Sequence, residues 1–79
     1  MIKTKADFKP LIKAMTYEQA RALDNDLHAA YCQPDSKGST KAAAKAALSK
    51  YFQDVDPDIT IGNINAIHWM VESQVERKS

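Results

Sequence analysis

Apolar side chains recur at every third or fourth position in four stretches of the chain, and segments rich in polar and turn-forming residues separate these stretches. Such spacing places the apolar residues of each stretch on one side of an α-helix. The pattern predicts helices near residues 7–15, 17–32, 40–53 and 60–77, the first of them short. We therefore expect an all-α fold, a small four-helix bundle-like single domain that spans residues 1–79.

Local signals set the expected ends of the first two helices. Asp7 is expected to cap the first helix, with Pro10 in its first turn, where the missing N–H does no harm. Thr16 and Gln19 have the spacing of a capping box at the start of the second helix. The turn-forming residues at 33–39 predict the one clear loop, which we expect to be the most mobile segment.

The starts of the last two helices are less definite in the sequence. Ser39 or Thr40 can cap the third helix, and Asp58 or Thr60 can cap the fourth. Residues 59–61 are all β-branched and could instead form a brief extended stretch. The helical period is clear only after this stretch, so the sequence favours a helix there.

The predicted core combines the larger apolar residues of the four helical stripes. A chain of 79 residues has room for one modest core only. Its expected members are Phe8, Leu11, Ile12, Met15, Leu23, Leu27, Tyr31, Leu48, Tyr51, Phe52, Ile64, Ile67, Val71 and Val75.

The last helix has a second apolar side in addition to its core stripe. Ala66, Trp69 and Met70 project from this side. One interpretation is that the helix is central and is covered by neighbours on two sides. The other is that these three residues form a contact patch for another protein or for a second copy of the chain, because Trp and Met are enriched in interfaces.

Charged residues alternate in blocks along a chain whose net charge is only +1. Basic segments at 1–15 and 36–53 alternate with acidic segments at 16–35 and 54–58. Lysines repeat at every fourth position in both basic segments, and so share one helix face in each. The two rows consist of Lys5, Lys9 and Lys13, and of Lys37, Lys41 and Lys45, with Lys50 nearby.

The second lysine row suggests an alternative function. A nucleic-acid-binding module could use Lys37, Lys41, Lys45 and Lys50 to neutralise phosphates. Against this, the chain has almost no arginine for reading bases, and its aspartate blocks would repel a polyanion. Nucleic acid is therefore the less favoured partner.

One strip of residues has metal-ligand spacing. Asp24, His28 and Cys32 lie four residues apart on the second predicted helix. A zinc site needs a fourth ligand or an open water position, and the remaining histidine, His68, lies on the last helix. Nothing in the sequence requires these residues to converge, so we expect no metal and no cofactor, and we interpret Cys32 as a small apolar residue.

The aspartates of the segment 54–58 begin like a calcium-binding loop, but the resemblance then fails. Ile59 stands where such a loop needs glycine, and Asn65 stands where it needs a bidentate glutamate. Catalysis has equally little support, because His28 and Cys32 on one helix stripe lack an orienting third group and an oxyanion donor. We expect no catalytic residues and no enzymatic activity.

The predicted function is therefore that of a small non-enzymatic regulator or adaptor that binds another protein through Ala66, Trp69 and Met70. Small intracellular chains without catalytic residues are typical of bacterial or phage accessory factors, including inhibitors of host or defence enzymes, and we place this chain in that class. A homo-oligomeric structural protein is a further alternative. The single cysteine and the lack of any apolar run near 20 residues predict a cytoplasmic chain with no membrane partner.

Overall fold

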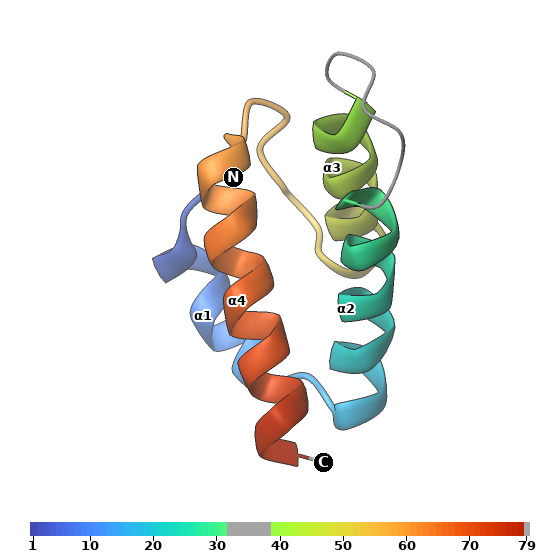
Figure 1. Ribbon diagram of the computed structural model, residues 1–79. Helices are drawn as coiled ribbons and strands as arrows, with labels where there is room; N and C mark the ends of the chain where they lie inside the picture. The colour runs from blue at the N-terminus through green and yellow to red at the C-terminus, as the bar shows by residue number, and fades with distance from the viewer. Residues whose placement is uncertain (32–38, 79) are drawn as a thin grey trace.

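The computed structural model describes residues 1–31 and 39–78, and in these residues the chain forms four α-helices (Figure 1). Their bounds are Lys5–Lys13 for α1, Tyr17–Tyr31 for α2, Ser39–Tyr51 for α3 and Ile61–Lys78 for α4. The predicted all-α fold with a short first helix is confirmed. Cys32, Lys37 and all of the predicted loop at 33–39 except Ser39 lie outside the described residues.

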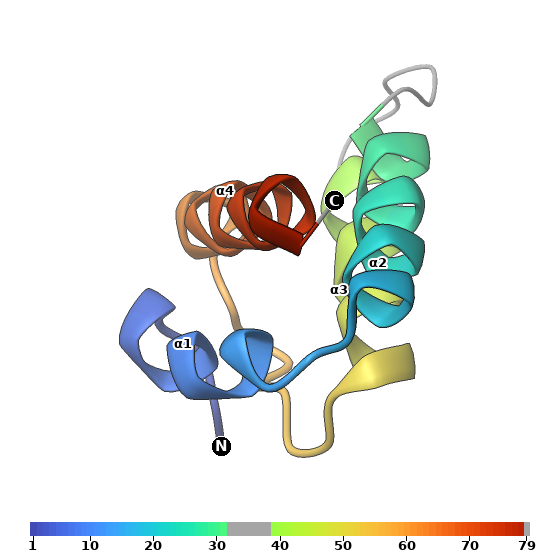
Figure 2. The same cartoon turned by 90° about the horizontal axis from the view of Figure 1, so that it is seen from below.

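Helices α2 and α4 form the centre of the bundle, since α4 packs against both α1 and α2, and α3 packs chiefly against α2. In Figure 2, α1 lies below α4, and the pair formed by α2 and α3 lies to the right of α4. This arrangement explains why α4 has apolar residues on two sides. One side faces α2, and the other faces the short helix α1.

Helix α1 begins two residues earlier than the sequence suggested. Its N-cap is Thr4, whose hydroxyl oxygen accepts the Asp7 N–H at 3.3 Å, while a carboxylate oxygen of Asp7 accepts the Thr4 N–H at 3.2 Å. The prediction that Asp7 is the cap was wrong, because Asp7 is the third helical residue and completes a capping box. Pro10 consequently lies inside the helix and not in its first turn.

The capping box predicted for α2 is confirmed. The Thr16 N–H donates to Oε1 of Gln19 at 3.0 Å, and the Gln19 N–H donates to Oγ1 of Thr16 at 3.1 Å. At the start of α4, the side chain of Thr60 accepts the Asn63 N–H at 3.2 Å. Thr60 is therefore the cap of α4, and no extended stretch at 59–61 precedes the helix, since Ile61 is its first residue.

Most of the predicted core is buried in the structure. Tyr31, Tyr51 and Val75 are only partly buried against it. The fully confirmed members are Phe8, Ile12, Met15, Leu23, Leu27, Leu48, Phe52, Ile64, Ile67 and Val71.

Leu11 was wrongly placed in the core, because 42% of it is exposed. Helix α1 packs mainly against one helix, α4, so its buried face is narrow. The buried residues of α1 are Phe8 and Ile12. The connector between α3 and α4 supplies a core residue that helical periodicity did not reveal, Ile59, which is 1% exposed. A turn places it there: the Ile59 N–H donates to the Asp56 carbonyl, and the Asp56 carboxylate accepts the Asp58 N–H.

The N-terminal residues are fixed to this same connector. Ile2 forms an isolated parallel bridge with Val55, in which the Ile2 N–H donates to the Asp54 carbonyl at 2.8 Å and the Asp56 N–H donates to the Ile2 carbonyl at 2.9 Å. Asp54 adopts a positive φ of 62°, a conformation that Asp tolerates better than most residues. The bridge holds the start of α1 close to the end of α3.

The capping carboxylate of Asp7 predicts a dependence of stability on pH. Hydrogen bonds from the backbone N–H groups of Lys3 and Thr4 hold the pKa of Asp7 below its ordinary value of 3.8. The folded chain thus binds this proton less tightly than the unfolded chain, so the carboxylate stabilises the fold above pH 3.8 and ceases to do so as the pH falls through the lowered value.

We expect Asp7→Asn to lower the melting temperature by a few degrees at neutral pH and by less at an acidic pH below 3.8. Thermal unfolding followed by circular dichroism at both pH values tests this. Asp58→Asn is the matched control, and it should change the melting temperature little at either pH. A deficit of Asp7→Asn that persists undiminished in acid would contradict the assignment.

Candidate functional site

A groove runs between α1 and α4, and it contains all three residues predicted to bind a protein. Its volume is about 510 Å³. We call it the α1–α4 groove. The lining residues are Lys5, Lys9, Ile12, Lys13, Ala66, Trp69, Met70, Ser73, Gln74 and Arg77.

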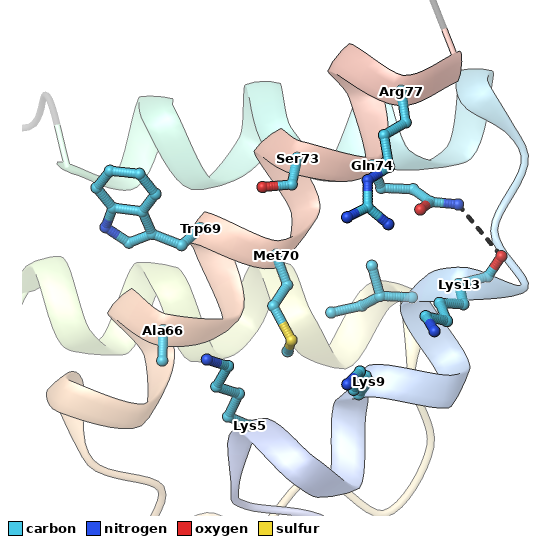
Figure 3. A pocket seen from close by; sticks show the side chains of 10 residues that line it. Lys5, Lys9, Lys13, Ala66, Trp69, Met70, Ser73, Gln74 and Arg77 are labelled. Atoms are coloured by element: carbon cyan, nitrogen blue, oxygen red, sulfur yellow. Dashed lines mark hydrogen bonds between the residues drawn. The ribbon is translucent and has the colours of Figure 1, made fainter.

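The floor of the groove is apolar. Ile12 contributes a buried side chain from α1, and Ala66 and Met70 contribute half-buried side chains from α4. Trp69 stands at one end, where 73% of it is exposed. Figure 3 shows the Met70 side chain directed between the two helices, whereas the indole of Trp69 extends outward from α4. Ile12, Ala66 and Met70 therefore form the apolar floor, and the exposed Trp69 borders it.

The rim of the groove is basic. Lys5, Lys9 and Lys13 line it from α1, and Arg77 lines it from the last turn of α4 (Figure 3). Among the described residues that line the groove, none is acidic. The first lysine row of the sequence and the second apolar side of the last helix thus belong to one surface.

A hydrogen bond between the helices fixes the width of the groove at one end. Nε2 of Gln74 donates to the carbonyl oxygen of Lys13 at 3.2 Å, and Gln74 is only 6% exposed. This carbonyl belongs to the last turn of α1, where carbonyl groups have no partner within the helix. Gln74, Ser73 and Arg77 were not identified from the sequence, since only the packing of α1 on α4 brings them beside the lysines.

The second lysine row does not form an equivalent basic face in the described residues. Nζ of Lys45 donates to the carbonyl oxygen of Pro57 at 2.7 Å, and Nζ of Lys50 lies 3.1 Å from a carboxylate oxygen of Asp26. The hydrogen bond to Asp26 raises the pKa of Lys50. Two of the three described lysines proposed for nucleic acid, Lys45 and Lys50, thus have partners within the chain. The third, Lys41, is exposed.

The histidines and two carboxylates lie on a different side of α4. Asp24 and His28, two members of the metal-ligand strip considered above, meet His68 and Glu72 across the contact between α2 and α4. The third member of the strip, Cys32, lies outside the described residues.

In the part of the chain that the structure describes, no helix is long and apolar enough to span a bilayer.

Comparison of the chain with family models, with curated proteins and with solved structures gives no match. The geometry of the chain itself therefore defines the kind of molecule it is. In these terms the molecule is a small all-α domain with an apolar groove that has a basic rim.

Proposed function

We propose that the chain is a small non-enzymatic regulator or adaptor that binds an acidic, amphipathic segment of another protein in the α1–α4 groove. The observation that carries the proposal is the exposed indole of Trp69 at the end of an apolar floor. Exposed tryptophan is uncommon on a surface with no partner, and tryptophan is enriched among residues that dominate binding energy. The proposed setting is the cytoplasm.

The charge of the rim supports the choice of partner. Four cationic side chains surround the floor, and no described lining residue would repel a carboxylate. A segment with apolar residues on one face and Asp or Glu on its flanks would match both properties, as amphipathic helices do when they occupy apolar grooves. Rim charges of this kind mainly accelerate encounter and fix orientation, while the apolar contact supplies affinity.

A second copy of the chain fits the groove less well. In a two-fold symmetric dimer the same patch lies on both sides of the interface. Lysines of one groove would then approach lysines of the other, which is unfavourable. Like-charge repulsion therefore favours an acidic partner over self-association through the groove.

Selection of peptides from a random phage-displayed library on immobilised protein tests the proposal. We expect enriched sequences to combine Leu, Phe or Trp with Asp or Glu. A selected peptide, labelled with fluorescein, should bind about tenfold more weakly to Trp69→Ala by fluorescence anisotropy. Because Trp69 is largely exposed, the variant should keep the melting temperature of the wild type.

A matched pair of charge reversals tests the role of the rim. Lys9→Glu lies in the groove and Lys41→Glu lies outside it, and each changes the net charge equally. Only Lys9→Glu should weaken peptide binding at low salt, and the difference should shrink as salt increases. Enriched peptides without acidic residues, or equal effects of the two reversals, would contradict the proposal.

The nucleic-acid alternative makes the opposite prediction. If the second lysine row binds phosphates, single-stranded DNA retained at low salt should be lost with Lys41→Glu and unaffected by Trp69→Ala. That pattern, together with a failed peptide selection, would replace the proposed function by the alternative one.

A further inference from the structure

Two pairs of potential metal ligands face each other across the contact between α2 and α4. Asp24 and His28 are four residues apart on α2, and His68 and Glu72 are four residues apart on α4. Residues at this spacing share a helix face. One ligand atom from each of the four side chains lies within 4.8 Å of all the others, so the bundle brings four ligands from two helices to one point.

The distances in this cluster suit a small metal ion. Nε2 of His68 lies 3.0 Å from Oδ1 of Asp24 and 3.3 Å from Oε1 of Glu72. Nε2 of His28 lies 2.9 Å from the same Glu72 oxygen and 3.5 Å from the same Asp24 oxygen. Tetrahedral zinc with bonds of about 2.0 Å keeps neighbouring ligand atoms about 3.3 Å apart. All four nitrogen–oxygen distances are therefore close to the edge length of such a tetrahedron.

The surroundings orient the inner ligands. The side chains of His68 and Asp24 are only 13% and 16% exposed. The ring of Tyr31 stacks on His68 with the two planes 5° apart, and the Tyr31 hydroxyl donates to Oδ1 of Asn65. The imidazole of His68 is thus held in place before any ion arrives.

The outer ligands leave a route for entry. The side chains of His28 and Glu72 are 54% and 37% exposed, so small rotations of these two can adjust the geometry around an ion. Two hydrogen-bond distances, 2.9 Å from His28 to Glu72 and 3.0 Å from His68 to Asp24, hold the four groups together in the absence of an ion. A divalent ion would satisfy both carboxylates and both imidazole nitrogens at once, and two carboxylates balance its charge.

The sequence led us to expect no metal, but on this convergence we infer that Asp24, His28, His68 and Glu72 bind a divalent first-row transition ion, with zinc as the representative, between α2 and α4. Calcium and magnesium prefer oxygen ligands, whereas two of the four ligands here are imidazole nitrogens, which suit transition ions. Four protein ligands complete a tetrahedron, which is the arrangement of structural zinc and not of catalytic zinc. The ion joins the two central helices and stabilises the bundle, and this inference is independent of the groove.

Zinc chloride added to chelator-treated protein tests the site. The experiment uses Cys32→Ser throughout, so that the thiol cannot supply a ligand. Isothermal titration calorimetry should give one ion per chain, and the melting temperature should rise by about 10 °C when free zinc is about 100 times the dissociation constant. Cobalt in place of zinc should give the visible absorption bands of a tetrahedral ion.

Variants of the exposed ligands distinguish this site from other zinc binding. His28→Gln and Glu72→Gln should each weaken zinc binding at least tenfold while the chain remains folded in the absence of metal. Glu18→Gln, an exposed carboxylate on the same helix as His28, is the matched control and should bind as the parent does. Absence of any heat or shift in melting temperature with excess zinc would overturn the inference, and so would equal affinity in all three variants.

Discussion

Replacement of Phe8 by alanine is expected to reduce the free energy of unfolding by about 3–5 kcal/mol, a large part of the total of about 5–15 kcal/mol typical of natural domains. Phe8 is 0% exposed, and its ring contacts Phe52 edge to face with centroids 5.1 Å apart. The side chain connects α1 to the end of α3. Its loss leaves a cavity that a short peripheral helix cannot close without separating from α4.

Urea unfolding followed by circular dichroism measures this effect. The midpoint should fall well below that of the wild type while the slope of the transition is unchanged. Leu11→Ala, in the same helix, removes a large side chain that is 42% exposed, and it should cost much less. Similar losses for the two variants would contradict the expectation that the buried packing of Phe8 is what holds α1 in the fold.

An enlarged side chain at Ala44 should be the next most damaging change. Ala44 is 0% exposed, and α3 packs chiefly against α2. Small residues on facing helices permit a close approach, so Ala44→Leu must push α3 away or force strained rotamers. We expect a loss of about 1–3 kcal/mol in the free energy of unfolding.

The same substitution at Ala46 is the control. Ala46 lies in the same helix but is exposed, and Ala and Leu have similar helix propensities. Ala46→Leu should therefore change the free energy of unfolding by less than about 0.5 kcal/mol. An equally large loss at Ala46 would mean that the close approach of α2 and α3 does not depend on the small side chain at position 44.

Local sequence signals predicted the helices well because each signal acts within a few residues. Periodicity located the four helices, and the Thr16–Gln19 pair located the start of α2 to the residue. The same reasoning misassigned Asp7, because a carboxylate near a helix start can be the cap itself or the third residue that completes a capping box. Thr4, three residues earlier, was the deciding signal.

Contacts between distant segments could not be predicted in the same way. The bridge between Ile2 and Val55 depends on a turn with positive φ, for which a single sequence gives no clear sign. The register of α2 against α4 decides whether His28 meets Glu72. Spacing identified Asp24 and His28 as neighbours, but their partners on α4 depend on how the two helices pack.

The α1–α4 groove could be predicted in part. The apolar residues Ala66, Trp69 and Met70 were recognised from the helical projection, and the lysine row of α1 was recognised from its four-residue repeat. That the two sets of residues line one groove was not predicted, since it depends on how α1 packs against α4. Leu11 illustrates the converse, because a periodic apolar position stays exposed where no helix covers it.

The exposed position of Trp69 has a spectroscopic consequence. It is the only tryptophan of the chain, and its indole is already largely hydrated in the native fold. Its emission maximum should therefore lie near that of the free amino acid and change little during denaturation. A shift of this maximum to shorter wavelength would instead report that something has covered the ring, which makes the molecule its own fluorescent sensor for occupancy.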